Sequence, residues 1–437
     1  MLLSIRPIRM SALLIVLVSL VACMQMLKRE NMQSALLSGR VGDALVIAEE
    51  QDRQQKDVLA SLNKGMLRRI KGNYQASNQI FEVAKKQIEE LYGISVSEQA
   101  GALVVNDAMR SYSGDRYEQV LLHAYMAMNY IEMDDLDAAR VEMLQADVKM
   151  QEWGEQPEED PFVRYLSGMI YEALGEKDEA LIAYRQAKKV YQSTKDKQSL
   201  DIPLVLKTDL LRMLAEQGLD NELRLLKKEL GIKQYKPAKS SKDYGELIVV
   251  LSSGLASIRN EKSIIANTGD EIVDTVRISL PAYEKARPRN LSRLVSGDKV
   301  SVDLELVEDV DALARNALSS DMPLITARAI ARAVVKHKMQ DKVKEKRGEL
   351  MGLLATVTNV VTERADTRSW TTLPQTIQMA RVRLPKGTNK INIEIYNTVG
   401  TLVDTTSREV VIKPGQKTFL TEHWVAPNMS LNEMSKK

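Results

Sequence analysis

The feature that most constrains this chain is a pattern of small, bulky and turn-forming residues that recurs in its first half. Between residues 25 and 231 the apolar residues follow the three-and-four spacing of amphipathic helices, and turn signals interrupt them roughly every 12 to 15 residues. Within this helical region a single template occurs three times at the same offsets. Its copies contain Gly65, Arg68, Gly72, Ser77, Phe81 and Ala84; Ala127, Tyr130, Asp134, Ala139, Met143 and Ala146; and Gly168, Tyr171, Gly175, Ala180, Tyr184 and Ala187.

The template has a simple physical meaning. A small residue lets two helices approach, a turn residue follows seven positions later, and a small residue of the second helix receives a bulky neighbour. The spacing resembles the tetratricopeptide repeat, in which helix pairs must stack because no single pair can bury its own apolar face. The resemblance implies an all-α repeat domain over residues 23–231, with residues 202–231 as a fourth, degenerate pair. The alternative is an unrelated helical bundle with chance periodicity.

The same resemblance predicts which side chains line the concave groove of the repeats. They are the residues directly after the small anchors, namely Met66, Met128 and Met169. Such a groove is apolar and lacks the Lys and Asn side chains with which typical members bind a terminal carboxylate. Two alternatives remain: another segment of the same chain fills the groove, which we favour, or adaptable methionines hold an apolar helix of a partner.

The first 23 residues have the pattern of a secretory signal. Arg6 and Arg9 precede an apolar run that is shorter than the roughly 20 residues needed to span a bilayer. Leu20-Val-Ala-Cys23 resembles the lipobox of bacterial lipoproteins, which implies a signal peptide at residues 1–22 and acylation of Cys23, palmitate included. Cys23 is the only cysteine, so acylation would remove an unpaired thiol from an oxidising compartment. The alternative is an uncleaved helix in the inner membrane.

The residue that follows Cys23 bears on the destination. It is Met24, not the aspartate that commonly retains lipoproteins in the inner membrane. The resemblance therefore implies a lipid anchor in the outer membrane and a chain that faces the periplasm.

The second half has a different pattern. Residues 232–243 are polar and basic, which is typical of a linker, and residues 244–437 then form a further domain. Apolar or alternating runs predict strands within 245–306, at Gly245–Ser252, Val273–Leu280 and Lys299–Leu306. Further strands are predicted within 377–423, at Ile377–Leu384, Lys390–Tyr396, Arg408–Ile412 and Thr418–His423. Between them, residues 309–363 have a helical pattern that begins at Val310 and restarts near Pro323. We therefore expect a multidomain α+β protein whose C-terminal α+β domain has a mainly antiparallel sheet and a long helical insertion.

Several motifs in combination resemble an uncharacterised family of proteobacterial tetratricopeptide-repeat lipoproteins. They are Asp115-Arg-Tyr-Glu118 with Val120, His123, Tyr125 and Ala127-Met-Asn-Tyr130; Ala139-Arg-Val-Glu142; and Ala365-Asp-Thr-Arg-Ser-Trp370 with Leu373-Pro374. Members are found near small lipoproteins similar to activators of penicillin-binding proteins. The resemblance implies a role in the envelope or in peptidoglycan maintenance, and it supplies no catalytic residue.

Charge and motif content exclude some functions. Lys and Arg number 61 against 59 Asp and Glu, and removal of Arg6 and Arg9 with the signal leaves 59 of each. A neutral chain lacks the clustered positive charge that nucleic-acid binding needs. The three histidines have no metal-ligand spacing, and phosphate, dinucleotide and serine-hydrolase motifs are absent from the sequence. We expect no catalytic residue, metal or cofactor. A cell-wall or glycan hydrolase with dispersed carboxylates remains an alternative, because such carboxylates have no local spacing signature.

Other polar residues have structural interpretations beside functional ones. Asp366, Arg368 and Trp370 could form a ligand site, but we favour an Asp366–Arg368 pair with Trp370 closing the core. Arg116 with Glu118, and Arg140 with Glu142, are predicted to form ion pairs between repeats. The run from Lys336 to Arg347, which contains His337, is predicted to be a solvated helix face, with contact to anionic lipid or peptidoglycan as the alternative.

Together these features predict a non-enzymatic, lipid-anchored scaffold of the bacterial cell envelope that binds protein partners through its repeats and its C-terminal domain. The alternatives are a regulator of peptidoglycan synthesis and a cell-wall hydrolase.

Overall fold

The computed structural model describes residues 31–102, 111–153, 159–198, 200–232, 242–267, 275–297, 300–347 and 364–426. The predicted signal peptide and Cys23 lie outside the described residues, as do most of the predicted linker and residues 348–363 of the predicted helical insertion. None of the helices in the described ranges is both long and apolar enough to cross a bilayer.

The N-terminal half consists of helices that pack in antiparallel pairs. After a short helix at residues 31–37, the pairs are α3 with α4, α5 with α6, α7 with α8 and α9 with α10. The fourth pair occupies the region where a degenerate pair was expected. The bounds are α2 Val41–Gln54, α3 Val58–Ile70, α4 Tyr74–Ala102, α5 Arg116–Glu132, α6 Leu136–Glu152, α7 Pro161–Leu174, α8 Lys177–Gln198, α9 Leu204–Glu216 and α10 Asp220–Glu229.

The turn residue of each template copy ends the first helix of its pair in a left-handed conformation. Gly72 has φ 75°, Asp134 has φ 59° and Gly175 has φ 85°. A residue in the left-handed conformation lets the chain reverse. This conformation costs glycine little free energy because glycine has no Cβ. Asp134 is the only non-glycine residue with positive φ among the described residues. Aspartate side chains cap the N-termini of two helices. Asp135 accepts a hydrogen bond from the Ala138 N–H of α6, and Asp160 accepts one from the Val163 N–H of α7.

The small anchors of the template let bulky side chains reach the backbone of the neighbouring helix. A Cβ on Gly65 would lie 2.4 Å from the Phe81 ring, and a Cβ on Gly168 would lie 2.4 Å from the Tyr184 ring. Both rings are completely buried. The glycines are therefore required by close packing between helices, as the repeat pattern predicts.

The C-terminal half contains ten strands and one long helix within the described ranges. The bounds are β1 Tyr244–Ser253, β2 Arg259–Asn267, β3 Thr275–Tyr283, β4 Leu291–Ser296, β5 Val300–Asp303, β6 Glu305–Asp309, α11 Val310–Arg347, β7 Thr376–Pro385, β8 Gly387–Tyr396, β9 Leu402–Ile412 and β10 Lys417–Trp424. The α+β class is confirmed, and the long helix lies between β6 and β7 as expected.

Details of the C-terminal half differ from the prediction. Three sheets form instead of one: β10-β1-β7-β6, β5-β4-β8-β9 and the ribbon β2-β3. Pairing is antiparallel except between β1 and β10. Strands β2 and β4 lack a long alternating run and were not predicted. Pro323 does not restart α11, which is continuous. Pro323 is exposed, so water can satisfy the carbonyl that its missing N–H leaves unbonded.

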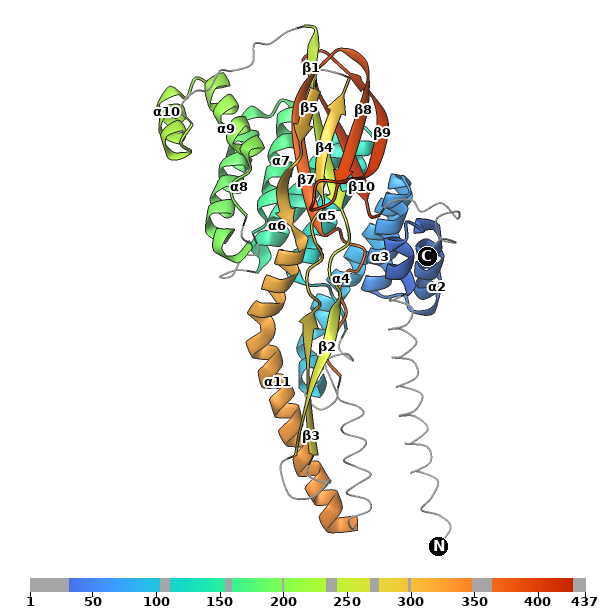
Figure 1. Ribbon diagram of the computed structural model, residues 1–437. Helices are drawn as coiled ribbons and strands as arrows, with labels where there is room; N and C mark the ends of the chain where they lie inside the picture. Colours follow the sequence, from blue (N-terminus) through green and yellow to red (C-terminus); the bar gives the residue numbers. More distant parts are fainter. Residues whose placement is uncertain are drawn as a thin grey trace.

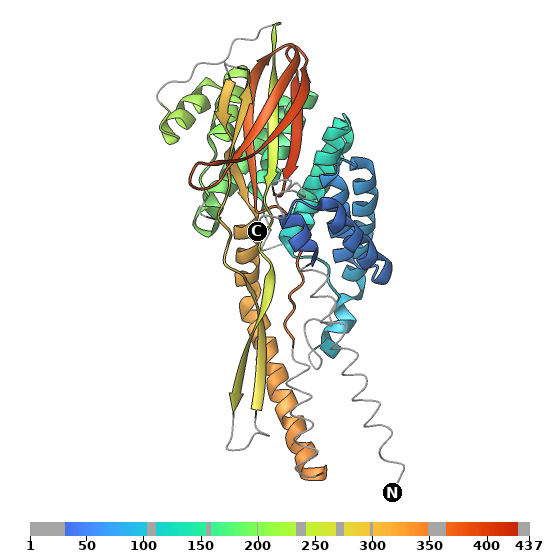
Figure 2. The ribbon, with the colours of Figure 1, turned by 45° about the vertical axis from the view of Figure 1, so that its right-hand side comes forward.

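The two four-stranded sheets and the repeat helices form three layers. Strand β1 lies in the middle layer and is buried on both faces. Its Leu247 and Val249 pack against the second sheet, whereas Ile248 and Val250 belong to the same hydrophobic cluster as the repeat helices. Figure 1 shows α5 and α7 beside the sheets, and Figures 1 and 2 show α11 and the β2-β3 ribbon running together away from them. The two predicted domains therefore share one continuous core.

Candidate functional site

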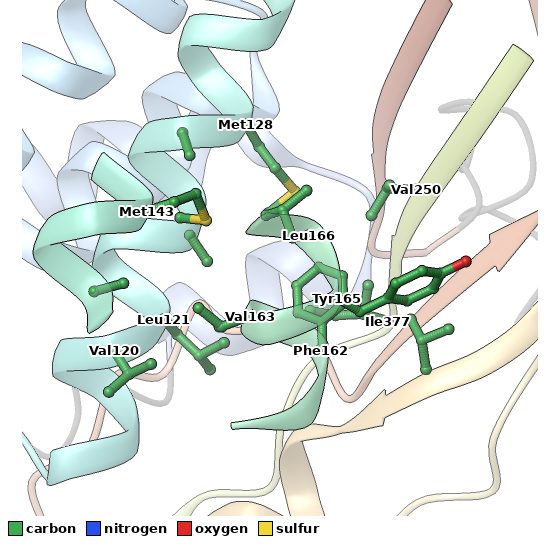
Figure 3. Close-up of a cluster of buried hydrophobic side chains, with 14 of the residues drawn as sticks. Val120, Leu121, Met128, Met143, Phe162, Val163, Tyr165, Leu166, Val250 and Ile377 are labelled. Atoms are coloured by element: carbon green, nitrogen blue, oxygen red, sulfur yellow. The ribbon is translucent and has the colours of Figure 1, made fainter. Parts of the chain in front are cut away.

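The concave groove of the repeats is filled by the C-terminal half of the chain. Met66, Met128 and Met169 are completely buried. They belong to one hydrophobic cluster with Val250 of β1 and Ile377 of β7. Figure 3 shows Met128 and Tyr165 of the repeats together with Val250 and Ile377 of the sheet. Of the two alternatives for the groove, the structure shows the one in which the chain itself occupies it.

Trp370 is the central side chain of this packing. It is 1% exposed, and its ring makes edge contacts with Phe81 of α4 and Tyr125 of α5, at centroid distances of 5.7 and 5.9 Å. The indole N–H donates to Thr372 Oγ1 over 2.9 Å. Trp370 therefore anchors the segment that precedes β7 inside the repeat helices.

Asp366 and Arg368 pair with each other, apart from Trp370. The guanidinium of Arg368 donates to both carboxylate oxygens of Asp366, at 2.9 and 2.7 Å, and lies over the ring of Tyr112. This pair is partly exposed, whereas Trp370 is in the core. The arrangement is the structural one that we favoured for these three residues.

Glu118 makes bonds that the ion-pair prediction missed. Its carboxylate accepts the backbone N–H of Trp370 at 2.7 Å, the N–H of Asp115 at 3.0 Å and the hydroxyl of Tyr112. Burial, and next the nearby charge of Asp115, raise the pKa of Glu118 to about 7. The prediction of an interrepeat ion pair is therefore wrong for Glu118. Its position at the buried N-terminus of α5 directs the carboxylate to backbone N–H groups, including one from the C-terminal half.

Arg116, the predicted partner of Glu118, packs against an aromatic ring instead. The guanidinium of Arg116 lies 5.4 Å from the centre of the Trp153 ring. Asp115, beside it, forms an ion pair with Arg259 of β2. The start of α5 is therefore joined both to the segment of Trp370 and to the β2-β3 ribbon.

The pairing predicted for Arg140 and Glu142 is correct in kind but not in partner. Arg140 of α6 bonds Glu176, in the turn between α7 and α8, at 2.8 Å. Glu142 bonds Lys85 of α4 at 3.2 Å and the Nδ1 atom of His123 at 2.8 Å. The contacts of Arg140 with Glu176 and of Glu142 with Lys85 join different repeats, whereas His123 and Glu142 lie in one helix pair. His123 is buried on α5, whereas His337, which was predicted to lie on a solvated face, is partly buried on α11.

A second charged centre joins the repeats to the sheet through Glu172 of α7. Arg381 of β7 donates to both Glu172 oxygens at 3.0 Å, and Lys417 of β10 lies 3.0 Å from Oε1. Arg212 of α9 is the third cation, and it lies 2.6 Å from Glu172 Oε1. Burial alone would raise the pKa of Glu172, but the charges of Arg381 and Arg212 outweigh it and hold the pKa well below its usual range. Asp209 also pairs with Arg212 and Arg381, and Glu246 pairs with Arg381. Glu172 is therefore a buried carboxylate in a balanced network of three cations and three carboxylates.

A third polar centre surrounds Arg69 of α3. Its guanidinium donates to Asn129 Oδ1 of α5 at 2.7 Å and to Thr421 Oγ1 of β10 at 2.8 Å. The sequence pattern of the repeats could have identified both Arg69 and Glu172 as groove residues. Each follows a groove-facing methionine by three residues, so it lies on the same helix face. A charge at such a position indicates a buried polar contact in the groove.

A surface groove lies between the β2-β3 ribbon and α11. It has a volume of about 630 Å³ and is lined by Lys262, Ser263, Ile264, Leu280, Pro281, Ala282 and Met322. This lining contains no carboxylate. Among the described residues, no three His, Cys, Asp or Glu side chains are placed to hold a metal ion.

Known proteins resemble the repeat region of the chain. The sequence model of the cohesin loading factor family matches residues 60–225, which is less than half of the chain. No curated protein matches the sequence.

Similar solved structures also cover about half of the chain. MamA from Desulfovibrio magneticus RS-1 is 14% identical with a TM-score of 0.31, covering 47% of this chain and 90% of that one. MamA MSR-1 is 15% identical with a TM-score of 0.28, covering 48% and 95%. A kinesin light chain from Podospora anserina with nearly identical TPR-like repeats is 15% identical with a TM-score of 0.31, covering 47% and 91%.

Proposed function

We propose that the protein is a non-enzymatic, lipid-anchored scaffold in the bacterial periplasm that binds envelope proteins through its outer surfaces. The observation that carries the proposal is the filled groove. The site where helical repeats usually hold a peptide is occupied by Trp370 and the sheet, so the repeats and the C-terminal half form one platform. The buried polar side chains of Glu118, Glu172 and Arg69 bond the two halves to each other.

The lipid anchor rests on the lipobox resemblance at Cys23. Its test is metabolic labelling of cells with a palmitate analogue, with the wild type compared with Cys23→Ala. We expect label only in the wild type, which should fractionate with the outer membrane. Equal labelling of the two proteins, or release of the wild type as a free periplasmic protein, would remove the anchor from the proposal.

The scaffold role is tested by crosslinking intact cells and capturing the full-length protein. We expect the same envelope proteins in repeated captures and their absence from captures of an unrelated lipoprotein. The family resemblance implies regulation of peptidoglycan synthesis, so a synthase or its activator among them would narrow the role. If captures match the unrelated lipoprotein, the scaffold proposal fails.

The hydrolase alternative has less support. The groove beside α11 has no carboxylate in its lining, and the carboxylates of Glu118 and Glu172 are buried and bonded. We expect no release of soluble fragments when the purified protein is incubated with peptidoglycan. Fragment release that survives repeated purification would favour the hydrolase. No role in cohesin loading is assigned, because that family match ends before the C-terminal half.

A further inference from the structure

The outward face of α11 is apolar where a solvent-facing helix is usually polar. Leu324, Ile330, Val334 and Val335 are 53%, 48%, 48% and 40% exposed. Two small exposed residues, Ala327 and Ala331, lie between them, and the exposed Lys338 follows at the end of the stripe. These seven residues, called here the α11 outer face, recur at three-and-four spacing and so form one continuous stripe.

The inward face of the same helix makes the contrast sharper. Arg332 is only 1% exposed and lies between buried Ala329 and Ala333. A charged residue therefore points toward the protein while branched aliphatic residues point toward water, the reverse of the usual amphipathic arrangement. Scattered exposed apolar side chains need no explanation, but a continuous apolar stripe marks an interaction surface.

The shape of the stripe fits a helix. From Leu324 to Lys338 it spans 15 residues, or about 22 Å of helix axis at 1.5 Å per residue, which is four turns. Ala327 and Ala331 lie at the positions where a second helix would cross, and small residues there allow close approach. The stripe has no aromatic residue, whereas helices that lie on membranes use Trp, Phe and Leu to enter the lipid.

The charge beyond the stripe favours an acidic partner. From Lys336 to Arg347 the chain has six Lys or Arg residues against two acidic ones. A second copy of α11 in parallel would place two cationic segments side by side, and an antiparallel copy would offer only Asp321 against each. Glu or Asp residues flanking an apolar stripe would instead be attracted to this segment, as in paired helices.

We propose that the α11 outer face binds an amphipathic helix of another envelope protein, with small and aliphatic residues on its contact face and Glu or Asp at its flanks. This inference rests on the proposed scaffold function and identifies the surface and the partner chemistry for it. Because these side chains are already exposed, partner binding does not require the two halves to separate.

The test is site-specific photocrosslinking in intact cells with the full-length protein. A photoreactive aromatic residue replaces Ala331, and in a control it replaces Leu144, an exposed apolar residue of α6. We expect one discrete adduct from position 331 and none from position 144. Peptide mapping should place the adduct on a segment of another protein with three-and-four apolar spacing and acidic flanks.

Surface variants then test the contact itself. Ile330→Gln with Val334→Gln should reduce the position-331 adduct about tenfold or more, which corresponds to about 1.4 kcal/mol of binding. Val141→Gln with Val148→Gln, an exposed apolar pair on α6, should leave it unchanged. Far-ultraviolet circular dichroism and the urea midpoint should match the wild type in both, because all four side chains face water.

Several outcomes would overturn the inference. They are an absent adduct, an adduct to a second copy or to lipid, a mapped segment without acidic flanks, and equal loss in both double variants. Flotation of the protein with phosphatidylglycerol vesicles that requires Ile330 and Val334 would assign the face to a membrane instead. If whole-protein capture still recovers specific partners in these cases, the scaffold function stands and only this surface is wrong.

Discussion

The contact between Gly168 and Tyr184 provides a direct test of the repeat packing. In Gly168→Ala the new Cβ would lie 2.4 Å from two carbons of the Tyr184 ring and 3.2 Å from the Ala180 carbonyl oxygen. Ordinary contacts are about 1 Å longer than the first distance, so the ring or the helix must move. The ring has little freedom, because it is fully buried and its hydroxyl donates to Glu172 Oε2 at 2.7 Å.

The expected cost follows from opposing contributions. Overpacking costs about 1–3 kcal/mol, and a weakened hydrogen bond to Glu172 adds about 1 kcal/mol. Replacing glycine by alanine inside a helix stabilises the helix by about 1 kcal/mol, because alanine has the higher helix propensity. We therefore expect Gly168→Ala to lower the free energy of unfolding by about 1–3 kcal/mol in urea denaturation followed by circular dichroism.

A matched control separates packing from helix propensity. Gly42 lies in the first turn of α2 and has no heavy atom within 4 Å of the position of an added Cβ. Gly42→Ala should leave stability unchanged or raise it by up to about 1 kcal/mol. Shrinking the ring with Tyr184→Leu should make Gly168→Ala less harmful than it is alone, because the two residues are in contact. Equal urea midpoints for the two alanine variants would refute the packing argument.

Four further substitutions address other contacts. Asp134→Gly should stabilise the protein by about 1 kcal/mol, because Asp134 has φ 59°, and thermal unfolding would measure the gain. Trp370→Ala should cost about 3–5 kcal/mol by urea denaturation, and a cost below about 1 kcal/mol would show that the groove is not closed by this side chain. Arg381→Met should cost about 3–5 kcal/mol by the same assay, since it leaves the carboxylates of Glu172, Asp209 and Glu246 with two cations, and a neutral result would contradict that charge balance. Glu118 has a pKa raised to about 7 in the folded chain against an ordinary value of 4.5, so it favours folding fully below about pH 4.5 and this contribution is lost as the pH rises through 7. The urea midpoint of Glu118→Gln, compared with the wild type from about pH 4.5 to 8, should fall less steeply with pH. Parallel curves would contradict the assignment.

Much of the helical half follows from local patterns. Gly65, Gly168 and the turn residue Gly175 could be placed from spacing, because a helix pair presents the same offsets wherever it occurs. The apolar run of β1 likewise predicts a strand. The pattern was less informative at β2, where Glu261, Lys262 and Ser263 conceal a ribbon strand, and at Pro323, where a long helix continues because the proline faces water.

The site residues show where local information ends. Glu118 pairs with the Trp370 N–H across 252 positions of sequence, and Arg69 meets Thr421 across 352. Nothing in the spacing of either residue identifies its partner, although the helix face of Arg69 could have marked it as a groove residue. The apolar α11 outer face was also missed, because a sequence pattern shows that a helix has two faces and not which of them meets the protein.

The sequence by itself determined the repeat template, the turns between helices and the α+β class, because each depends on residues within one or two turns of one another. Only the tertiary structure decided that the groove is filled from within, that Glu172 belongs to a buried network of three cations and three carboxylates, and that the apolar face of α11 points outward. These depend on which distant surfaces exclude water together, and that choice is made by the whole chain when the layers pack.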